Sequence, residues 1–199
     1  MRRRRGAAGG LAGALVGGLV ATLVALLVPA RAAHAAPDTK PNALTIEPLA
    51  VVFARTIAIE YERGIGGWVS VFVQPSFVYG SSRVVTTDGN ATTTDGEYVA
   101  VGGTLGVRIF PWRAAPTGPF VSPFAGLAYT HASAGGESAS GLGWSVGGLI
   151  GYTFVLGSVF ELSLGGGAAY AAYALEAGGK RFGDRGVLPA FRLAVGAVF

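Results

Sequence analysis

The sequence predicts an all-β protein, an eight-stranded antiparallel up-and-down transmembrane β-barrel preceded by a helical signal peptide. The last strand alternates to its end, with Phe191, Leu193 and Val195 on one face and Phe199 as the terminal residue. Many of the 33 glycines lie inside apolar segments, where a helix would lose about 1 kcal/mol for each of them. The apolar periodicity after the leader is close to two, which is typical of strands with one lipid-facing side and one crowded interior.

The leader has the three parts of a signal peptide. Arginines fill positions 2–5, no charge occurs between Gly6 and Ala30, and Ala33-His34-Ala35 fits the small-x-small cleavage rule. We therefore expect cleavage after Ala35. The alternative is an uncleaved anchor, because the apolar run is just long enough to span a membrane as a helix.

This cleavage divides the chain into a signal peptide (1–35), a short lead (36–41) and a barrel (42–199). All 11 acidic residues lie after position 35, whereas five of the 15 basic residues lie before it, so the mature charge is 10 − 11 = −1. Nucleic acid is therefore not an expected partner. The absence of cysteine from the sequence excludes a disulfide framework and a thiolate metal site.

Each expected strand follows from alternation between apolar and small or polar residues. The expected strands cover residues 42–53, 56–63, 68–79, 97–110, 119–130, 143–154, 159–170 and 191–199. In the same order, the apolar residues expected to face outward on each strand are Leu44 and Ile46; Ile57, Ile59 and Tyr61; Val69, Val71 and Val73; Val99, Val101 and Leu105; Val121 and Leu127; Val146 and Ile150; Leu162 and Leu164; and Phe191, Leu193 and Val195. The parity of the first strand shifts at Pro48, which suits a β-bulge.

The connections alternate between short and long. Residues 64–67, 111–118 and 155–158 are expected to be tight turns, and the polar segments 80–96, 131–141 and 171–185 are expected to be loops. Short turns at one end and long loops at the other are typical of outer-membrane barrels. Aromatic residues expected at the two membrane interfaces are Trp68, Trp112, Trp144, Tyr79 and Tyr129. A soluble β-sandwich is the alternative fold.

Several short motifs resemble a known group. They are Pro41-Asn42-Ala43-Leu44, Ile59-Glu60-Tyr61-Glu62-Arg63, Gly118-Pro119-Phe120-Val121 and the terminal Phe199. With them, residues 42–199 resemble the small eight-stranded barrels of the OmpA-like transmembrane-domain superfamily, and most of all a bacterial barrel family of unknown function. The resemblance implies a bacterial outer-membrane location, with outer-membrane lipid as a partner, and recognition of Phe199 by the barrel-assembly machinery.

The parity of the strands points six charged residues into the barrel: Glu47, Glu60, Glu62, Arg108, Glu161 and Arg192. Buried charges must be paired or solvated, so we expect an internal network of ion pairs and water, in which Arg192 meets one of the inward glutamates, with Glu47 as a candidate. Eight strands leave room for side chains but not for an open channel. The alternative is a gated ion path or a carboxylate site for a cation or proton, because four glutamates face two arginines.

Two loop motifs bear on catalysis and metal binding. The pair His131 and Ser133, with Glu137 nearby, resembles the site of lipid A deacylase, although the loop is rich in glycine and Glu137 is close in sequence. Asp88-Gly89-Asn90 and Asp95-Gly96-Glu97 could supply oxygen ligands for calcium, but their spacing does not match a calcium loop and turn formation explains them equally well. We expect no cofactor, no metal and no enzymatic activity.

The sequence therefore favours a structural or surface-interaction role, exerted through the outer loops on an unknown extracellular partner. The alternatives are a lipid-modifying enzyme of the outer leaflet and a narrow channel or transporter.

Overall fold

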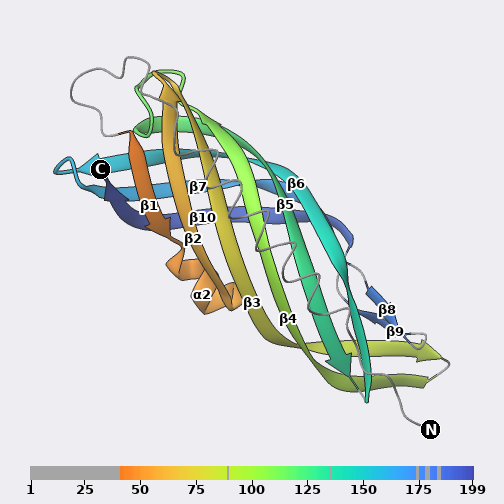
Figure 1. Cartoon of the computed structure of the whole chain (residues 1–199). Coiled ribbons are helices and arrows are strands. Elements are labelled where there is room, and N and C mark those ends of the chain that lie inside the picture. The colour runs from red at the N-terminus through yellow and green to blue at the C-terminus, as the bar shows by residue number, and fades with distance from the viewer. Residues whose placement is uncertain (1–40, 89, 135, 174, 178–179, 183–184) are drawn as a thin grey trace, which may run out of the picture. The chain divides into compact units, whose positions relative to one another are not determined.

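The chain closes into an eight-stranded antiparallel β-barrel (Figure 1). The computed structural model describes residues 41–88, 90–134, 136–173, 175–177, 180–182 and 185–199. The order of strands around the wall is β1-β10-β7-β6-β5-β4-β3-β2, and β8 and β9 form a separate two-stranded sheet. The predicted all-β fold, a closed barrel of eight antiparallel strands, is thus confirmed. Within the described residues, no helix is both long and apolar enough to cross a membrane.

The elements have the following bounds: β1 Asn42–Ile46, α2 Pro48–Ala54, β2 Thr56–Gly66, β3 Val69–Asp88, β4 Asn90–Ile109, β5 Gly118–Ala134, β6 Glu137–Leu156, β7 Phe160–Ala172, β8 Leu175–Ala177, β9 Lys180–Phe182 and β10 Arg185–Val198.

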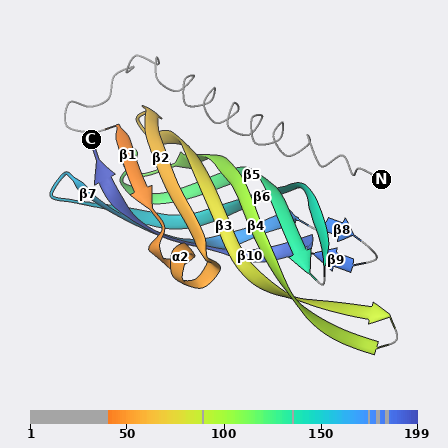
Figure 2. The ribbon, with the colours of Figure 1, turned by 60° about the horizontal axis from the view of Figure 1, so that its bottom comes forward.

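The barrel has two different ends. Asn42 and Phe199 meet at one of them, which we call the terminal end, where the connections β2–β3, β4–β5 and β6–β7 also lie. At the opposite end, which we call the hairpin end, β3 turns into β4 and β5 into β6. Figure 2 shows the β3–β4 hairpin running well past the other strands there.

Alternation along the strands separates an apolar outside from a polar inside. In β2, Ile57 and Ile59 are exposed, whereas Ala58, Glu60 and Glu62 are buried. Exposed large apolar residues continue around the wall and include Leu44, Phe77, Val99, Val101, Leu105, Val121, Leu127, Val146, Ile150, Phe154, Leu164 and Phe191. We call this surface the apolar belt. A single-domain protein in water does not normally expose so much contiguous apolar surface.

The prediction of a first strand over residues 42–53 is wrong. The strand ends at Ile46, and Pro48–Ala54 forms the helix α2. Proline is favourable in the first turn of a helix because its missing N–H has no intrahelical acceptor there. The shift of parity at Pro48 therefore marks a change to helix rather than a bulge.

The predictions of loops over residues 80–96 and 131–141 are also wrong. Strand β3 runs to Asp88 and β4 starts at Asn90, while β5 runs to Ala134 and β6 starts at Glu137. The long segment after β7 contains the short pair β8 and β9. Residues 80–96 are polar but contain valines and threonines, which favour strands, whereas residues 131–141 contain neither and become strands by pairing across the β5–β6 hairpin.

Glycines inside the barrel make room for large aromatic side chains. A Cβ atom on Gly106 would collide with the ring of Phe72, and one on Gly151 would collide with the ring of Phe120. Phe120 packs with Phe110 and Ala115 in a small buried cluster near the terminal end. The small residues that the sequence places inside the barrel thus give phenylalanines their space beside the charged interior.

Candidate functional site

The charged residues of the barrel interior come from four strands and one connection. Glu60 and Glu62 lie on β2, Arg108 on β4, Glu161 on β7 and Arg192 on β10, and each is at most 5% exposed. Glu47, between β1 and α2, has a side chain that is 17% exposed. Alternation of side chains between the two faces places the five strand residues inside the barrel, and Glu47 reaches the same interior through its ion pair with Arg192.

Arg108 joins the two glutamates of β2. Its Nη2 donates to Glu60 Oε2 at 2.7 Å, and its Nη1 donates to Glu62 Oε2. The Ser70 hydroxyl donates to the other oxygen of Glu62. The guanidinium also stacks on Phe72, with its central carbon 4.4 Å from the ring centroid. A charge in this interior is tolerable because it has both ion-pair and cation–π partners.

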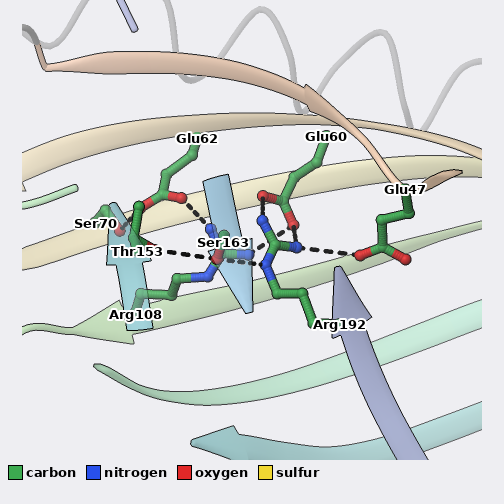
Figure 3. A network of polar contacts seen from close by, with 8 residues as sticks. All are labelled: Glu47, Glu60, Glu62, Ser70, Arg108, Thr153, Ser163 and Arg192. Carbon is green, nitrogen blue, oxygen red and sulfur yellow. Dashed lines mark hydrogen bonds and ion pairs between the residues drawn. The ribbon is translucent and has the colours of Figure 1, made fainter. Parts of the chain in front are cut away.

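Arg192 forms the second half of the network, as Figure 3 shows. Both of its terminal nitrogens donate to Glu60 at 2.9 Å, and Nη1 also donates to Glu47 Oε1 at 3.1 Å. Its Nε donates to the Ser163 hydroxyl at 2.9 Å. The predicted Arg192–Glu47 ion pair is therefore present, and Glu60 lies between two arginines as the centre of the network.

Glu161 differs from the other interior glutamates. Its side chain is fully buried, and no described residue donates a hydrogen bond to either of its carboxyl oxygens. The Thr45 and Ser122 hydroxyl oxygens and Arg108 Nε are buried without a hydrogen-bond partner among the described residues. With four glutamates and two arginines, carboxyl groups are in excess. The ion pairs can hold the strands together. Glu161 takes no part in the ion pairs found among the described residues, so its carboxyl group can exchange a proton or bind water.

The other predicted site residues lie apart from this network. His131 is exposed, and its Nδ1 lies 2.7 Å from the hydroxyl of Ser140, on the neighbouring strand, rather than beside Ser133. The side chain of Glu137 lies outside the described residues. Among the described residues, no group of three or more histidine, cysteine, aspartate or glutamate side chains is arranged to hold a metal ion.

The predicted interfacial aromatics are distributed over both ends. Trp68 and Trp112 lie in turns of the terminal end and are 58% and 77% exposed. Tyr79 and Trp144 are exposed further along the wall, and Tyr129 is half-buried. Phe199 is 56% exposed, and its backbone forms hydrogen bonds in both directions with Asn42.

Sequence reasoning missed two features of the interior. It did not find the stacking of Arg108 on Phe72, although both residues have inward parity and the rule that buried charge needs a partner could have suggested it. It also missed the order of the pairs, because the register between strands decides which arginine meets which glutamate, and no local pattern determines that register.

Comparisons with known proteins assign the chain to no family. No family model matches the chain, and no curated protein matches it. A solved structure that is similar is the crystal structure of Ail, the attachment invasion locus protein of Yersinia pestis, in complex with the heparin analogue sucrose octasulfate. The alignment has a TM-score of 0.36 and 12% sequence identity, and it covers 80% of this chain and 94% of that chain.

Proposed function

We propose that the protein is an outer-membrane β-barrel that presents its hairpin end to a partner outside the cell. The observation that carries the location is the combination of the apolar belt with a charged, hydrogen-bonded interior. A closed barrel is one of the two structures that satisfy every backbone polar group within lipid. The predicted signal peptide supports export, although residues 1–40 lie outside the described part of the chain.

The direction of the barrel follows from its connections. At the terminal end the start of β1 meets Phe199 and the strands end close to their connections, whereas at the hairpin end β3 and β4 extend well beyond their neighbours, and long extensions are typical of the outer side of outer-membrane barrels. The hairpin end then faces the outside. In this orientation Phe199 lies at the periplasmic end, where the assembly machinery would have access to it.

A surface-interaction role is supported by the length of the β3–β4 hairpin. Strand β3 has no pairing with β2 beyond Val78, and β4 pairs with β5 only from Gly96 onward. Residues 83–88 and 90–95 therefore form a ribbon that pairs only with itself, which we call the β3–β4 ribbon. Its two open strand edges are suited to binding an extended segment of a partner by main-chain hydrogen bonds.

The location is tested in a Gram-negative host that expresses the full chain. A folded barrel should migrate faster on a detergent gel before boiling than after it, and it should fractionate with the outer membrane.

The orientation is tested by labelling. The chain has no cysteine, so a single introduced cysteine reports whether its position is accessible from outside the cell. A membrane-impermeant maleimide should label Ser81→Cys at the hairpin end of intact cells but not the control Arg113→Cys in the turn at the terminal end. Labelling of Arg113→Cys alone would reverse the orientation, and a soluble protein would refute the location.

The interaction role is tested by shortening the ribbon. Because Ser82 and Gly96 are paired across the hairpin, the residues between them can be replaced by Asn-Gly, which forms a two-residue turn. Barrels with and without the ribbon, in lipid nanodiscs, are compared on immobilised glycans and extracellular-matrix proteins, with Arg113→Ala as the control. Binding that is lost with the ribbon supports the role, and binding that survives its removal contradicts it.

A further inference from the structure

The charges of the barrel interior do not balance. The interior contains four glutamates and two arginines among the described residues, so ionisation of all six would leave 4 − 2 = 2 negative charges in excess. Both arginines are already engaged, Arg192 by Glu47 and Glu60 and Arg108 by Glu60 and Glu62 (Figure 3). Burying a charge without compensation costs far more than burying a neutral polar group. At least one of the carboxyl groups therefore needs a further positive charge.

Glu161 is the carboxyl group with the least compensation. Glu47, Glu60 and Glu62 each form at least one ion pair with an arginine. Glu161 is 0% exposed, so surface water does not reach it, and no described residue donates a hydrogen bond to either of its oxygens. The missing positive charge is therefore needed first at Glu161.

The surroundings of Glu161 do not supply this charge. The charged groups that interact with it electrostatically are Glu60 and Glu62 on β2, Arg108 on β4 and Arg192 on β10. Two of these groups are acids and two are bases, so their charges cancel when all are ionised. The other buried polar residues of the described strands carry hydroxyl groups, which do not titrate: Thr45 on β1, Ser70 on β3, Ser122 on β5, Thr153 on β6 and Ser163 on β7 itself.

A proton suits this position better than a metal cation. A hard cation such as calcium takes about six or more oxygen ligands. Glu161 lies between Val155 of β6 and Gly196 of β10, where the backbone carbonyls are used in pairing the strands. No group of three or more histidine, cysteine, aspartate or glutamate side chains in the described part of the chain is arranged to hold a metal. A proton needs no additional ligand, and it makes the carboxyl group neutral.

We propose that Glu161 binds a proton in the folded barrel and keeps it at pH values where an exposed glutamate is ionised. In the unfolded chain the carboxyl loses its proton above about pH 4.3, the ordinary pKa of glutamate. Between this pH and the pH at which the folded barrel releases the proton, the unfolded chain binds fewer protons than the folded one. The barrel therefore becomes less stable as the pH rises through this range. This property belongs to the interior and goes beyond the proposed role of the hairpin end.

The test measures the unfolding equilibrium constant of the full chain in phosphatidylcholine vesicles with urea. At each pH, the constant of the native chain is divided by that of Glu161→Gln, which resembles the protonated carboxyl in shape and cannot ionise. The contributions of all other titrating groups then cancel. We expect the ratio to rise about tenfold between about pH 5 and pH 6, because unfolding releases one proton from Glu161. The control is Glu97→Gln, whose native side chain is exposed on β4, and the corresponding ratio should stay constant.

Infrared spectroscopy provides a second measurement that requires no unfolding. A protonated carboxyl group has a C=O stretching band that a carboxylate lacks. The folded native chain should show this band at about pH 6, well above the ordinary pKa of glutamate. The band should be absent from Glu161→Gln and from Glu161→Leu, and it should remain in Glu97→Gln. The leucine variant keeps the assignment possible if the glutamine variant does not fold.

Three outcomes would overturn the proton site. The first is a ratio that changes by less than about twofold between about pH 5 and pH 7. The second is the absence of the band from the native chain at about pH 6. The third is a stability that depends on sodium rather than tetramethylammonium at equal ionic strength in the native chain but not in Glu161→Gln, which would show that a metal cation neutralises the carboxyl.

These outcomes are distinguishable from a failure of the proposed function. A heat-modifiable barrel in the outer membrane that fails the tests of Glu161 loses the proton site and keeps its location. A soluble barrel that passes them keeps the proton site and loses the location.

Discussion

Replacing Arg192 by glutamine should strongly destabilise the barrel. The change removes both hydrogen bonds to Glu60, the contact with Glu47 and the bond to Ser163. Glu60 keeps Arg108, but Glu47 loses the only ion pair found for it among the described residues. Breaking a buried ion pair by removing one partner costs about 3–5 kcal/mol, because the remaining charge is left without compensation. We expect a loss in this range in the free energy of unfolding.

The assay is equilibrium urea unfolding of the barrel in vesicles, followed by tryptophan fluorescence and by the heat-modifiable gel band. The midpoint should fall while the slope stays unchanged, since the same surface is exposed on unfolding. Glu60→Gln in the Arg192→Gln background should cost less than in the native chain, because the two side chains are coupled. The control is Arg185→Gln on the same strand, which should leave the midpoint unchanged. A loss below about 1 kcal/mol for Arg192→Gln would refute this view of the interior network.

Three further predictions concern other parts of the barrel. Gly106→Ala should lower the free energy of unfolding by about 1–3 kcal/mol, because its Cβ would collide with Phe72, whereas Gly166→Ala has open space and should be neutral; urea unfolding of both variants checks this. Glu161→Leu should raise the free energy of unfolding by about 1 kcal/mol in the same assay, because it removes a buried carboxyl without a hydrogen-bond partner among the described residues. A clear decrease in the free energy of unfolding would show that the Glu161 carboxyl makes a stabilising contact. Deleting Phe199 should lower the amount of barrel in the outer membrane without reducing its passage across the inner membrane, as measured by cell fractionation, and an unchanged yield would contradict its role in assembly.

The interior of the barrel was predictable from alternation alone. Glu60 and Glu62 flank the outward Tyr61, and Arg192 lies between the outward Phe191 and Leu193, so parity places all three charges inside. Because the first and last strands of a barrel must be neighbours, the sequence also made Glu47 a candidate partner of Arg192, and the two form an ion pair. Parity is a local property, and a period of two residues leaves little freedom in assigning it.

The helix α2 and the long hairpins were not predictable in the same way. Seven residues such as PLAVVFA are too few to distinguish a period of two from one of 3.6, and Pro48 is compatible with both a bulge and a helix start. The β3–β4 ribbon is polar and interrupted by glycine, which is also typical of a loop. Its strand structure depends on hydrogen bonds across the hairpin, and these are not visible in either strand alone.

The pairing between β1 and β10, which closes the barrel, is short, and this affects the order in which the barrel forms. Neighbouring strands β3 and β4 share twenty residue pairs and β7 and β10 share thirteen, whereas β1 and β10 share four. The hairpin strands are adjacent in sequence, but the backbone contacts of Asn42 and Phe199 join residues 157 positions apart. Such a contact has a large loop-closure entropy and few hydrogen bonds to offset it. We therefore expect the sheet to assemble hairpin by hairpin, with the β1–β10 joint closing last and opening first.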